Sequence, residues 1–444
     1  MAKGFRSGIL SRSSRLMGVA AHVAGHEARH QVRRRLERSA EALGAHRLST
    51  TMRQAEALVS GLSDLKGAVM KAGQLLSIDA SDLLPPEAVE LLGRLQSHAE
   101  PVPFESLRAV LEEDLGPGWP ALLTDLDPRA AAAASIGQVH RARHEGRSVA
   151  VKIQYPGVAQ SIDSDLAMLH RISGSWLALT GRKIDLEQVF EEMRSVLHQE
   201  ADYVQEGLHM ERFRADLAGR PEYVVPTPMP AVSSARVLTA SWEDGVPLRE
   251  LLTPEAPPEL TRWLATTLLD LYCLEFFELG LVQTDPNPGN FLVRPEQRQL
   301  VLLDFGATLA YDDLFRLRYL ALLEVIGRGR RAEVVAAGVE QGMLDPREAP
   351  ETKDLFAELL LSAVEPFLAQ RQPFDFSDAD YAARTRDVGQ AFVKALRYSP
   401  PPRELVFLHR KLGGLFNIIK RMGVRLDLAP YWARMVGTEL RPAA

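Results

Sequence analysis

The spacing of hydrophobic positions changes along this chain of 444 residues. From about residue 29 to residue 100, apolar residues recur three and four positions apart, which predicts long amphipathic helices. Residues 136–157 alternate instead and are rich in Val and Ile, and Glu145-Gly146 supplies a turn, so a β-hairpin is expected there. Helical spacing returns from about 313 to 436. This order indicates an α+β protein with two lobes.

Shorter segments are assigned by the same patterns. The alanine-rich residues 130–134 are expected to form a loop that leads into the hairpin. Further helices are expected over residues 104–115, 159–180, 185–217 and 259–279. A polar turn joins two short strands, over 291–295 and 300–306.

Composition narrows the class of protein. The 46% hydrophobic content can bury a large core, and the net charge of −6 argues against a nucleic-acid partner. The single cysteine, Cys273, excludes an internal disulfide and a cysteine-based zinc site. The most apolar run, residues 263–281, contains Asp270, Glu275 and Glu278, so we expect a buried core helix and no membrane-spanning helix.

The N-terminal arm has a different charge. Residues 1–49 carry ten Lys/Arg and three Asp/Glu, with Phe, Ile, Leu and Met interspersed among the arginines. Such a segment is attracted to lipid headgroups, and it also resembles a transit peptide. An arm that docks on the protein itself explains the pattern equally well.

Small residues and a lysine within the predicted hairpin region point to phosphate chemistry. Ala132, Ala133, Ala134 and Ser135 precede the first strand, and small side chains let backbone N–H groups approach phosphates closely. Lys152 lies in mid-strand among Val and Ile, where pairing with phosphate oxygens would account for its charge. An edge-strand lysine that reaches water is the alternative.

A lysine with this role needs a carboxylate on a helix to hold it. Glu200, Asp202 and Glu206 are the candidates within residues 198–207. Taken alone, this segment would also suit a solvated acidic helix face.

Two motifs follow the apolar helix. Asp285 and Asn290 are five residues apart, the D-x-x-x-x-N spacing of a phosphotransfer loop, and Asp304 begins an Asp-Phe-Gly nineteen residues after Asp285. In these roles Asn290 and Asp304 would bind Mg²⁺, and Asp285 would orient or deprotonate a nucleophile. No His-Arg pair precedes Asp285, and no long activation segment follows Gly306, so a docked peptide substrate is not expected.

Together these motifs resemble the UbiB/ADCK (AarF-like) atypical kinases, and most closely their coenzyme Q branch. The likeness runs from about residue 60 to residue 430 and includes LKGAVMKAGQLLS, AAAASIGQVHRA, VAVKIQYPG, EADYVQE, QTDPNPGNF and LLDFGA, with FLHRKLGGLFN near residue 407. It implies Glu206 as the partner of Lys152. It also implies that Lys71 and Gln74 of the KxGQ motif face Glu200 and Asp202 and gate the site.

The resemblance implies a bilobal protein-kinase-like fold whose N-terminal helical extension packs over the active-site cleft. The expected parts are a basic arm (1–50), the helical extension with KxGQ (51–127), a small lobe with the ExD helix (128–245) and a mainly helical large lobe (246–444).

The function expected from residues and resemblance is an atypical kinase or ATPase that binds ATP with Mg²⁺ and supports coenzyme Q biosynthesis or isoprenoid lipid handling. A small-molecule or lipid kinase, and a nucleotide-bound scaffold for biosynthetic enzymes without turnover, remain alternatives. Candidate partners are a quinone precursor or isoprenoid lipid and a biosynthetic enzyme complex. The expected location is the cytoplasm, with peripheral attachment to the inner membrane through the basic arm.

Overall fold

The computed structural model describes residues 102–167, 170, 187–253, 255–396 and 403–437. The backbone is organised in two compact units. Among the described residues, the first comprises those up to Leu208 together with Thr227–Trp242, and the second comprises His209–Pro226 and those from Glu243 onward. The basic arm (1–50) and the long helices predicted over residues 29–100 lie outside the described residues.

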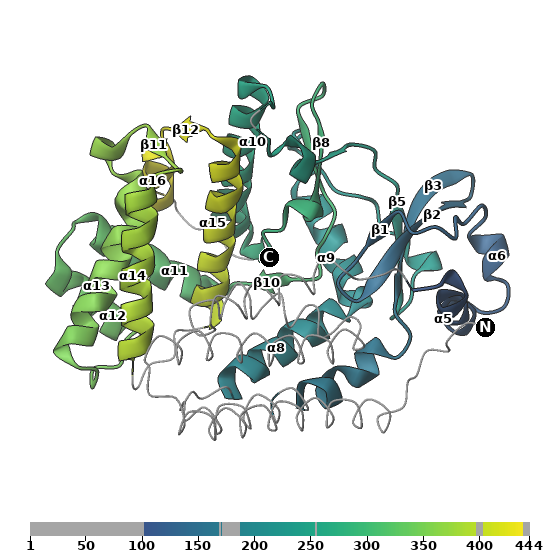
Figure 1. Cartoon of the computed structure of the whole chain (residues 1–444), viewed down its shortest axis with the longest axis horizontal. Coiled ribbons are helices and arrows are strands. Elements are labelled where there is room, and N and C mark those ends of the chain that lie inside the picture. The colour runs from purple at the N-terminus through teal and green to yellow at the C-terminus, as the bar shows by residue number, and fades with distance from the viewer. Residues whose placement is uncertain (1–101, 168–169, 171–186, 254, 397–402, 438–444) are drawn as a thin grey trace, which may run out of the picture. The chain divides into compact units, whose positions relative to one another are not determined.

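The first unit contains a four-stranded antiparallel sheet in the order β1-β2-β3-β5, whose strands are labelled in Figure 1. Its strands are β1 (Ala132–Ala133), β2 (Gly137–His144), β3 (Arg147–Gln154) and β5 (Val237–Ser241). The predicted hairpin is confirmed as β2–β3, because Glu145 and Gly146 both adopt positive φ, as a two-residue hairpin turn requires. The loop predicted over 130–134 is wrong in part, since Ala132 and Ala133 pair with β2.

Helices accompany this sheet. The buried side chains of α5 (Phe104–Leu115) pack against β3 and β5, and α6 (Trp119–Leu122) follows it. The single helix predicted over 185–217 is wrong, because the chain forms α8 (Glu187–Glu200) and α9 (Tyr203–Asp216). Asp202 causes the break, since its Oδ1 accepts the Gln205 N–H as a helix N-cap does.

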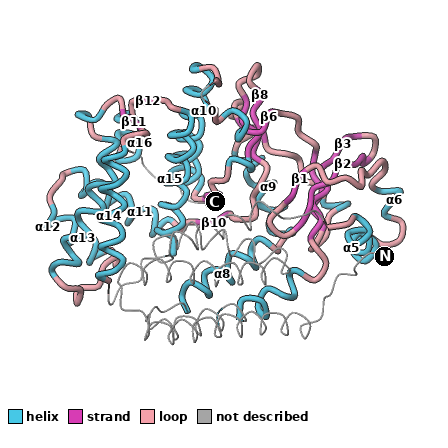
Figure 2. The backbone as a smooth tube through the Cα atoms, viewed as in Figure 1, coloured by secondary structure: helices cyan, strands magenta, loops and turns pink. Residues whose placement is uncertain are grey.

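The second unit contains a four-stranded sheet in the order β4-β9-β8-β6, of which Figure 2 shows β6 beside β8. Its strands are β4 (Tyr223–Val224), β9 (Gln299–Leu302), β8 (Phe291–Arg294) and β6 (Val246–Pro247). The predicted strand pair is confirmed as the hairpin β8–β9. Two further pairs are β7 (Leu281–Gln283) with β10 (Thr308–Ala310), and β11 (Phe374–Asp375) with β12 (Arg425–Leu426).

Most of the second unit is helical, as the periodicity predicts. Figure 1 shows α12, α13 and α14 side by side. The helices are α10 (Pro258–Cys273), α11 (Asp313–Gly327), α12 (Arg331–Glu340), α13 (Pro350–Val364), α14 (Ala379–Ala395), α15 (Arg403–Met422) and α16 (Ala429–Val436). None of these, nor any other helix in the described ranges, is long and apolar enough to cross a membrane.

The apolar helix predicted over 259–279 changes its winding after Cys273. Residues Leu274–Leu279 form a π-helical turn, which ends at Gly280 in the left-handed region with φ 65°. The fully buried guanidinium of Arg316 donates to the carbonyls of Phe276 and Phe277, at 3.0 and 2.7 Å. A cation that meets carbonyls without regular helical partners stabilises this irregular turn directly before β7.

Candidate active site

Lys152 is held by a carboxylate within the first unit. Its Nζ donates to both oxygens of Glu206, at 2.7 and 2.8 Å, and only 1% of the Glu206 side chain is exposed, against 18% for Lys152. Glu206 lies in the first turn of α9, where unpaired backbone N–H groups favour a negative charge. The ion pair therefore has both geometric and electrostatic support.

The strand explains where the lysine points. Val149, Val151 and Ile153 are fully buried on one face of β3, so Lys152 projects from the opposite face. Its Nζ also lies 4.9 Å from the ring centroid of Tyr203, the first residue of α9. An ammonium on an aromatic face gains a further attraction, so the start of α9 contacts the lysine twice.

The alanine-rich loop is tied to the end of α8. Ser135 Oγ donates to Glu200 Oε2 at 2.5 Å, and Glu200 is buried. Ala132 and Ala133 are exposed on β1, while Ala134 N–H donates to the Gly137 carbonyl and closes the loop. The exposed, small side chains leave the loop backbone open to a ligand.

Gly137 is required by the packing of this loop. A Cβ at that position would lie 2.3 Å from the Ile153 carbonyl oxygen and 2.9 Å from Tyr203 Oη. No side chain fits there without a backbone shift, so glycine lets the loop end close against β3 and α9.

In the second unit, two short segments are joined at both ends. Thr284 donates from its N–H and its Oγ1 to the Ala307 carbonyl, both at 2.8 Å. At the other end the Leu303 N–H donates to the Asn290 carbonyl at 2.9 Å, which continues the β8–β9 hairpin by one residue. The segments 284–290 and 303–307 therefore lie side by side.

Three of the predicted site residues meet in these segments. Asn290 Nδ2 donates to the backbone carbonyl of Asp285 at 3.2 Å and to its Oδ2 at 3.3 Å. This sets the amide so that Asn290 Oδ1 is the free acceptor. Asp304 uses Oδ1 to accept the Gly306 N–H at 3.0 Å. Neither Asn290 Oδ1 nor Asp304 Oδ2 has a hydrogen-bond partner within the described part of the chain.

The residues beside these segments are built into the core. Phe305 is buried, with its ring centroid 5.2 Å from that of Phe213, and its carbonyl is 3.3 Å from His209 Nδ1. Only six residues, 307–312, lie between Gly306 and α11, and they include β10 and the helix-capping Asp312, so the long activation segment of a peptide-directed kinase is absent from this described stretch.

A buried charged network lies next to the segment 284–290, which carries Asp285 and Asn290. The sequence analysis did not predict this network. Lys411 Nζ on α15 lies 3.1 Å from Glu275 Oε2 in the π-helical turn and 3.3 Å from Gln283 Oε1, two residues before Asp285. Lys411 and Glu275 are each 1% exposed. Burial raises the pKa of Glu275 above the usual carboxyl range, although the nearby ammonium opposes the shift.

The sequence analysis also did not predict a close contact between α15 and Pro286, in the segment 284–290. A Cβ on Gly414 would lie 2.1 Å from Pro286 Cγ, so only glycine lets the helix approach here. Signals for both features exist, because Lys411 falls on the apolar face between Leu408 and Leu415, and Gly413-Gly414 interrupts a helical pattern.

The gating residues are only partly described. Lys71 and Gln74 lie outside the described residues, and nothing in the structure relates them to Glu200 or Asp202. Glu200 is buried and bonded to Ser135, whereas Asp202 is exposed and caps α9. Of the three carboxylates considered for Lys152, Glu206 makes the contact.

Comparisons with known proteins agree with this picture. Residues 94–337 match the ABC1 atypical kinase-like domain. The chain is 34% identical over 374 residues to the mitochondrial atypical kinase COQ8B of Danio rerio, which covers 84% of this chain and 59% of that protein. It is 34% identical over 376 residues to the mitochondrial atypical kinase COQ8 of Saccharomyces cerevisiae, with 84% and 74% covered. The chain thus spans less than two thirds of the length of the Danio rerio relative.

A solved structure is also similar. It is Rv3197 of Mycobacterium tuberculosis in complex with erythromycin, with a TM-score of 0.59 and 25% sequence identity over 91% of this chain and 99% of that one. The α+β fold and the kinase-like domain are therefore confirmed.

Proposed function

The chain belongs to the ABC1 atypical kinase-like family, and on that premise we propose that it binds ATP with Mg²⁺ and cleaves the γ-phosphate. The observation that carries this proposal is a pair of oxygens on adjoining backbone segments, Asn290 Oδ1 and Asp304 Oδ2, that have no hydrogen-bond partner among the described residues. Mg²⁺ prefers hard oxygen ligands and is commonly held by one or two protein groups together with phosphate oxygens. The residues present therefore fit this ion.

Each remaining residue has a role that its contacts support. We assign Lys152 to the α- and β-phosphates and Glu206 to holding its ammonium in place. The small residues 132–135 would let backbone N–H groups approach the nucleotide. Bound Mg²⁺ would neutralise charge on the phosphate oxygens.

Asp285 is proposed as the residue that orients or deprotonates the nucleophile. It is buried, and Asn290 donates to its Oδ2, which fixes the carboxylate direction. Thr284 anchors the residue before it to Ala307. A carboxylate held in this way can accept a proton from water or from a hydroxyl group of a substrate.

The biological setting is proposed from the relatives. The Danio rerio and Saccharomyces cerevisiae proteins are named mitochondrial atypical kinases. We propose that this chain likewise supports coenzyme Q biosynthesis or isoprenoid lipid handling, at a membrane surface reached through its basic N-terminal arm. Because the chain spans only part of the first relative, the activity and partners of that whole protein are proposals here.

Phosphate release from ATP tests the chemistry. Asp285→Asn is expected to lower kcat by about 10²- to 10⁴-fold while ADP binding, measured by calorimetry, is retained. Asp304→Asn keeps the acceptor for the Gly306 N–H but loses the charge at the metal site, so Mg²⁺-dependent release should vanish. That variant is also the control for a contaminating ATPase.

The outcomes separate the candidate functions. Unchanged turnover in Asp285→Asn, with ADP still bound, would overturn the catalytic proposal and favour a nucleotide-bound scaffold. Transfer of labelled phosphate to a small molecule or lipid would identify a kinase. Vesicles that contain anionic lipid should raise phosphate release if the membrane-surface setting is right.

A further inference from the structure

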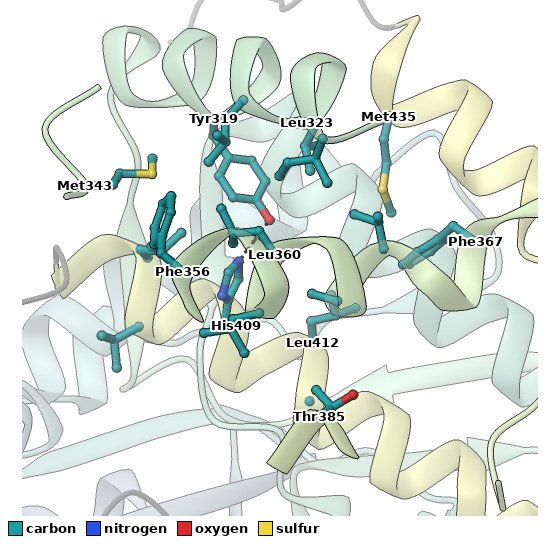
Figure 3. A pocket seen from close by; sticks show the side chains of 18 of the residues that line it. Tyr319, Leu323, Met343, Phe356, Leu360, Phe367, Thr385, His409, Leu412 and Met435 are labelled. Atoms are coloured by element: carbon teal, nitrogen blue, oxygen red, sulfur yellow. Dashed lines mark hydrogen bonds between the residues drawn. The ribbon is translucent and has the colours of Figure 1, made fainter. Parts of the chain in front are cut away.

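The helices of the second unit line a partly open cavity of about 390 Å³ that takes no part in the site above (Figure 3). Its wall includes Leu323, Phe356, Leu360, Leu412 and Met435, whose side chains surround one space. No Lys, Arg, Asp or Glu lines it among the described residues. A partly open, mainly apolar space of this size has the character of a small-molecule pocket.

His409 is one of the few polar side chains that line this largely apolar space, together with tyrosines and Thr385. His409 is half-buried and lines the cavity, and Tyr319 Oη lies 3.1 Å from its Nε2, the two side chains pointing toward each other in Figure 3. Burial lowers the pKa of His409 to about 4, so the ring is neutral at pH 7.

The hydrogen bond also determines where the ring proton sits. A phenol hydroxyl is a stronger acid than a neutral imidazole N–H, and an imidazole nitrogen is a stronger base than a phenol oxygen, so we assign Tyr319 Oη as the donor in this bond. Tyr319 thus donates its proton to His409 Nε2. A neutral imidazole that accepts at Nε2 carries its proton on Nδ1. Nδ1–H is therefore a donor, and no acceptor for it is found among the described residues.

We propose that this cavity binds an uncharged, largely apolar small molecule with one hydrogen-bond acceptor, which is met by the Nδ1–H of His409. The volume lies in the lower part of the range of small-molecule pockets, roughly 300–1,000 Å³. Apolar walls with one or two polar groups are the usual composition of such sites. A carboxylate or phosphate would be desolvated here without a cation, so anionic ligands are excluded.

The site does not depend on the proposed phosphotransfer chemistry. Binding is therefore measured on the full chain without nucleotide, so that the two proposals fail separately.

Three probes of nearly equal shape test the ligand class by isothermal titration calorimetry. Hexanophenone carries one ketone, hexylbenzene is the same skeleton without the acceptor, and 4-pentylbenzoate carries a charge. Hexanophenone should bind roughly 5-fold more tightly than hexylbenzene, the ratio expected for one net hydrogen bond. 4-Pentylbenzoate should not bind measurably. Failure of both uncharged probes, or tighter binding of the benzoate, would overturn the proposal.

Two variants locate the binding. His409→Phe should remove the preference for hexanophenone and leave hexylbenzene binding nearly unchanged. Leu412→Trp places a larger side chain in the cavity and should abolish binding of both probes, whereas the volume-conserving Leu412→Met should retain it. Binding that survives Leu412→Trp in a folded protein would place the ligand elsewhere and refute the assignment. If that variant does not fold, the probe series and His409→Phe still decide.

Discussion

The two units hold their candidate site residues in opposite ways. In the first unit the charged groups are already satisfied by one another, as in the two-point contact of Lys152 with Glu206. In the second unit the backbone holds the segments together, and Asn290 Oδ1 and Asp304 Oδ2 have no partner among the described residues. The buried ion pair of that unit, Lys411 with Glu275, lies behind the loop instead of in it.

This contrast distinguishes charged groups that stabilise the fold from charged groups that are available to bind a ligand. A buried carboxylate that is paired costs a great deal to unpair, so substitution of its partner should affect folding. An oxygen without a partner loses nothing within the fold when its charge is removed, so substitution there should affect ligand binding alone. The predictions below test this distinction, from the largest expected effect to the smallest.

Lys152→Met should have the largest effect on stability. It leaves the Glu206 carboxylate, 1% exposed, without its cation, which should lower the free energy of unfolding by about 3–5 kcal/mol in urea denaturation. The double variant Lys152→Met/Glu206→Gln should recover most of that loss. Asp304→Asn keeps its hydrogen bond to Gly306 and should stay within about 0.5 kcal/mol of the wild type. Equal destabilisation by Lys152→Met and Asp304→Asn would contradict the distinction.

Neighbouring glycines on α15 offer a matched pair in the second unit. Gly414→Ala places a Cβ 2.1 Å from Pro286 Cγ, so it should displace the helix from the loop, cost about 1–3 kcal/mol and reduce phosphate release. Gly413→Ala meets nothing within 4 Å and should stabilise the helix by about 0.5–1 kcal/mol with activity intact. Thermal unfolding and initial rates measure both variants. Similar rates in the two would show that the loop does not depend on this contact.

Acidification should change the free energy of unfolding through the buried pair of Glu275 and Lys411, and this is the smallest of the expected effects. Because burial raises the pKa of Glu275, the folded protein binds a proton more readily than the unfolded chain between the unfolded and folded pKa values. In that window the contribution of Glu275 to stability falls as pH rises, and its cost is complete above the folded pKa. The double variant Glu275→Gln/Lys411→Met removes this titration and should be at least as stable as the wild type near pH 7.

Its relative advantage should shrink as the pH is lowered from 7 toward 4.5. Urea denaturation at several pH values measures the difference. A gap that widens on acidification would mean that Lys411 keeps Glu275 ionised and that the pKa shift has the opposite sign.

The local predictions succeeded where the nearest residues decide the structure. The Glu145-Gly146 turn and the Val/Ile alternation were enough to predict β2–β3, and the periodicity predicted the helical second unit. The predictions failed at short elements, such as the strand over Ala132 and Ala133, and at the break before Asp202. Two-residue strands have no measurable period, and a single capping side chain can end a helix whose apolar pattern continues.

By itself the sequence determined the order and spacing of the motifs, and with them the family, since the five-residue spacing of Asp285 and Asn290 and the strand that carries Lys152 are local properties. Only the tertiary structure decided which side chains meet. Lys152 and Glu206 are 54 residues apart, and Lys411 and Gln283 are 128 apart. The cavity beside His409 likewise needs several distant helices at once. Local sequence sets backbone conformation and periodicity. Buried ion pairs and cavities, in contrast, form only when segments that are distant in the sequence have packed together.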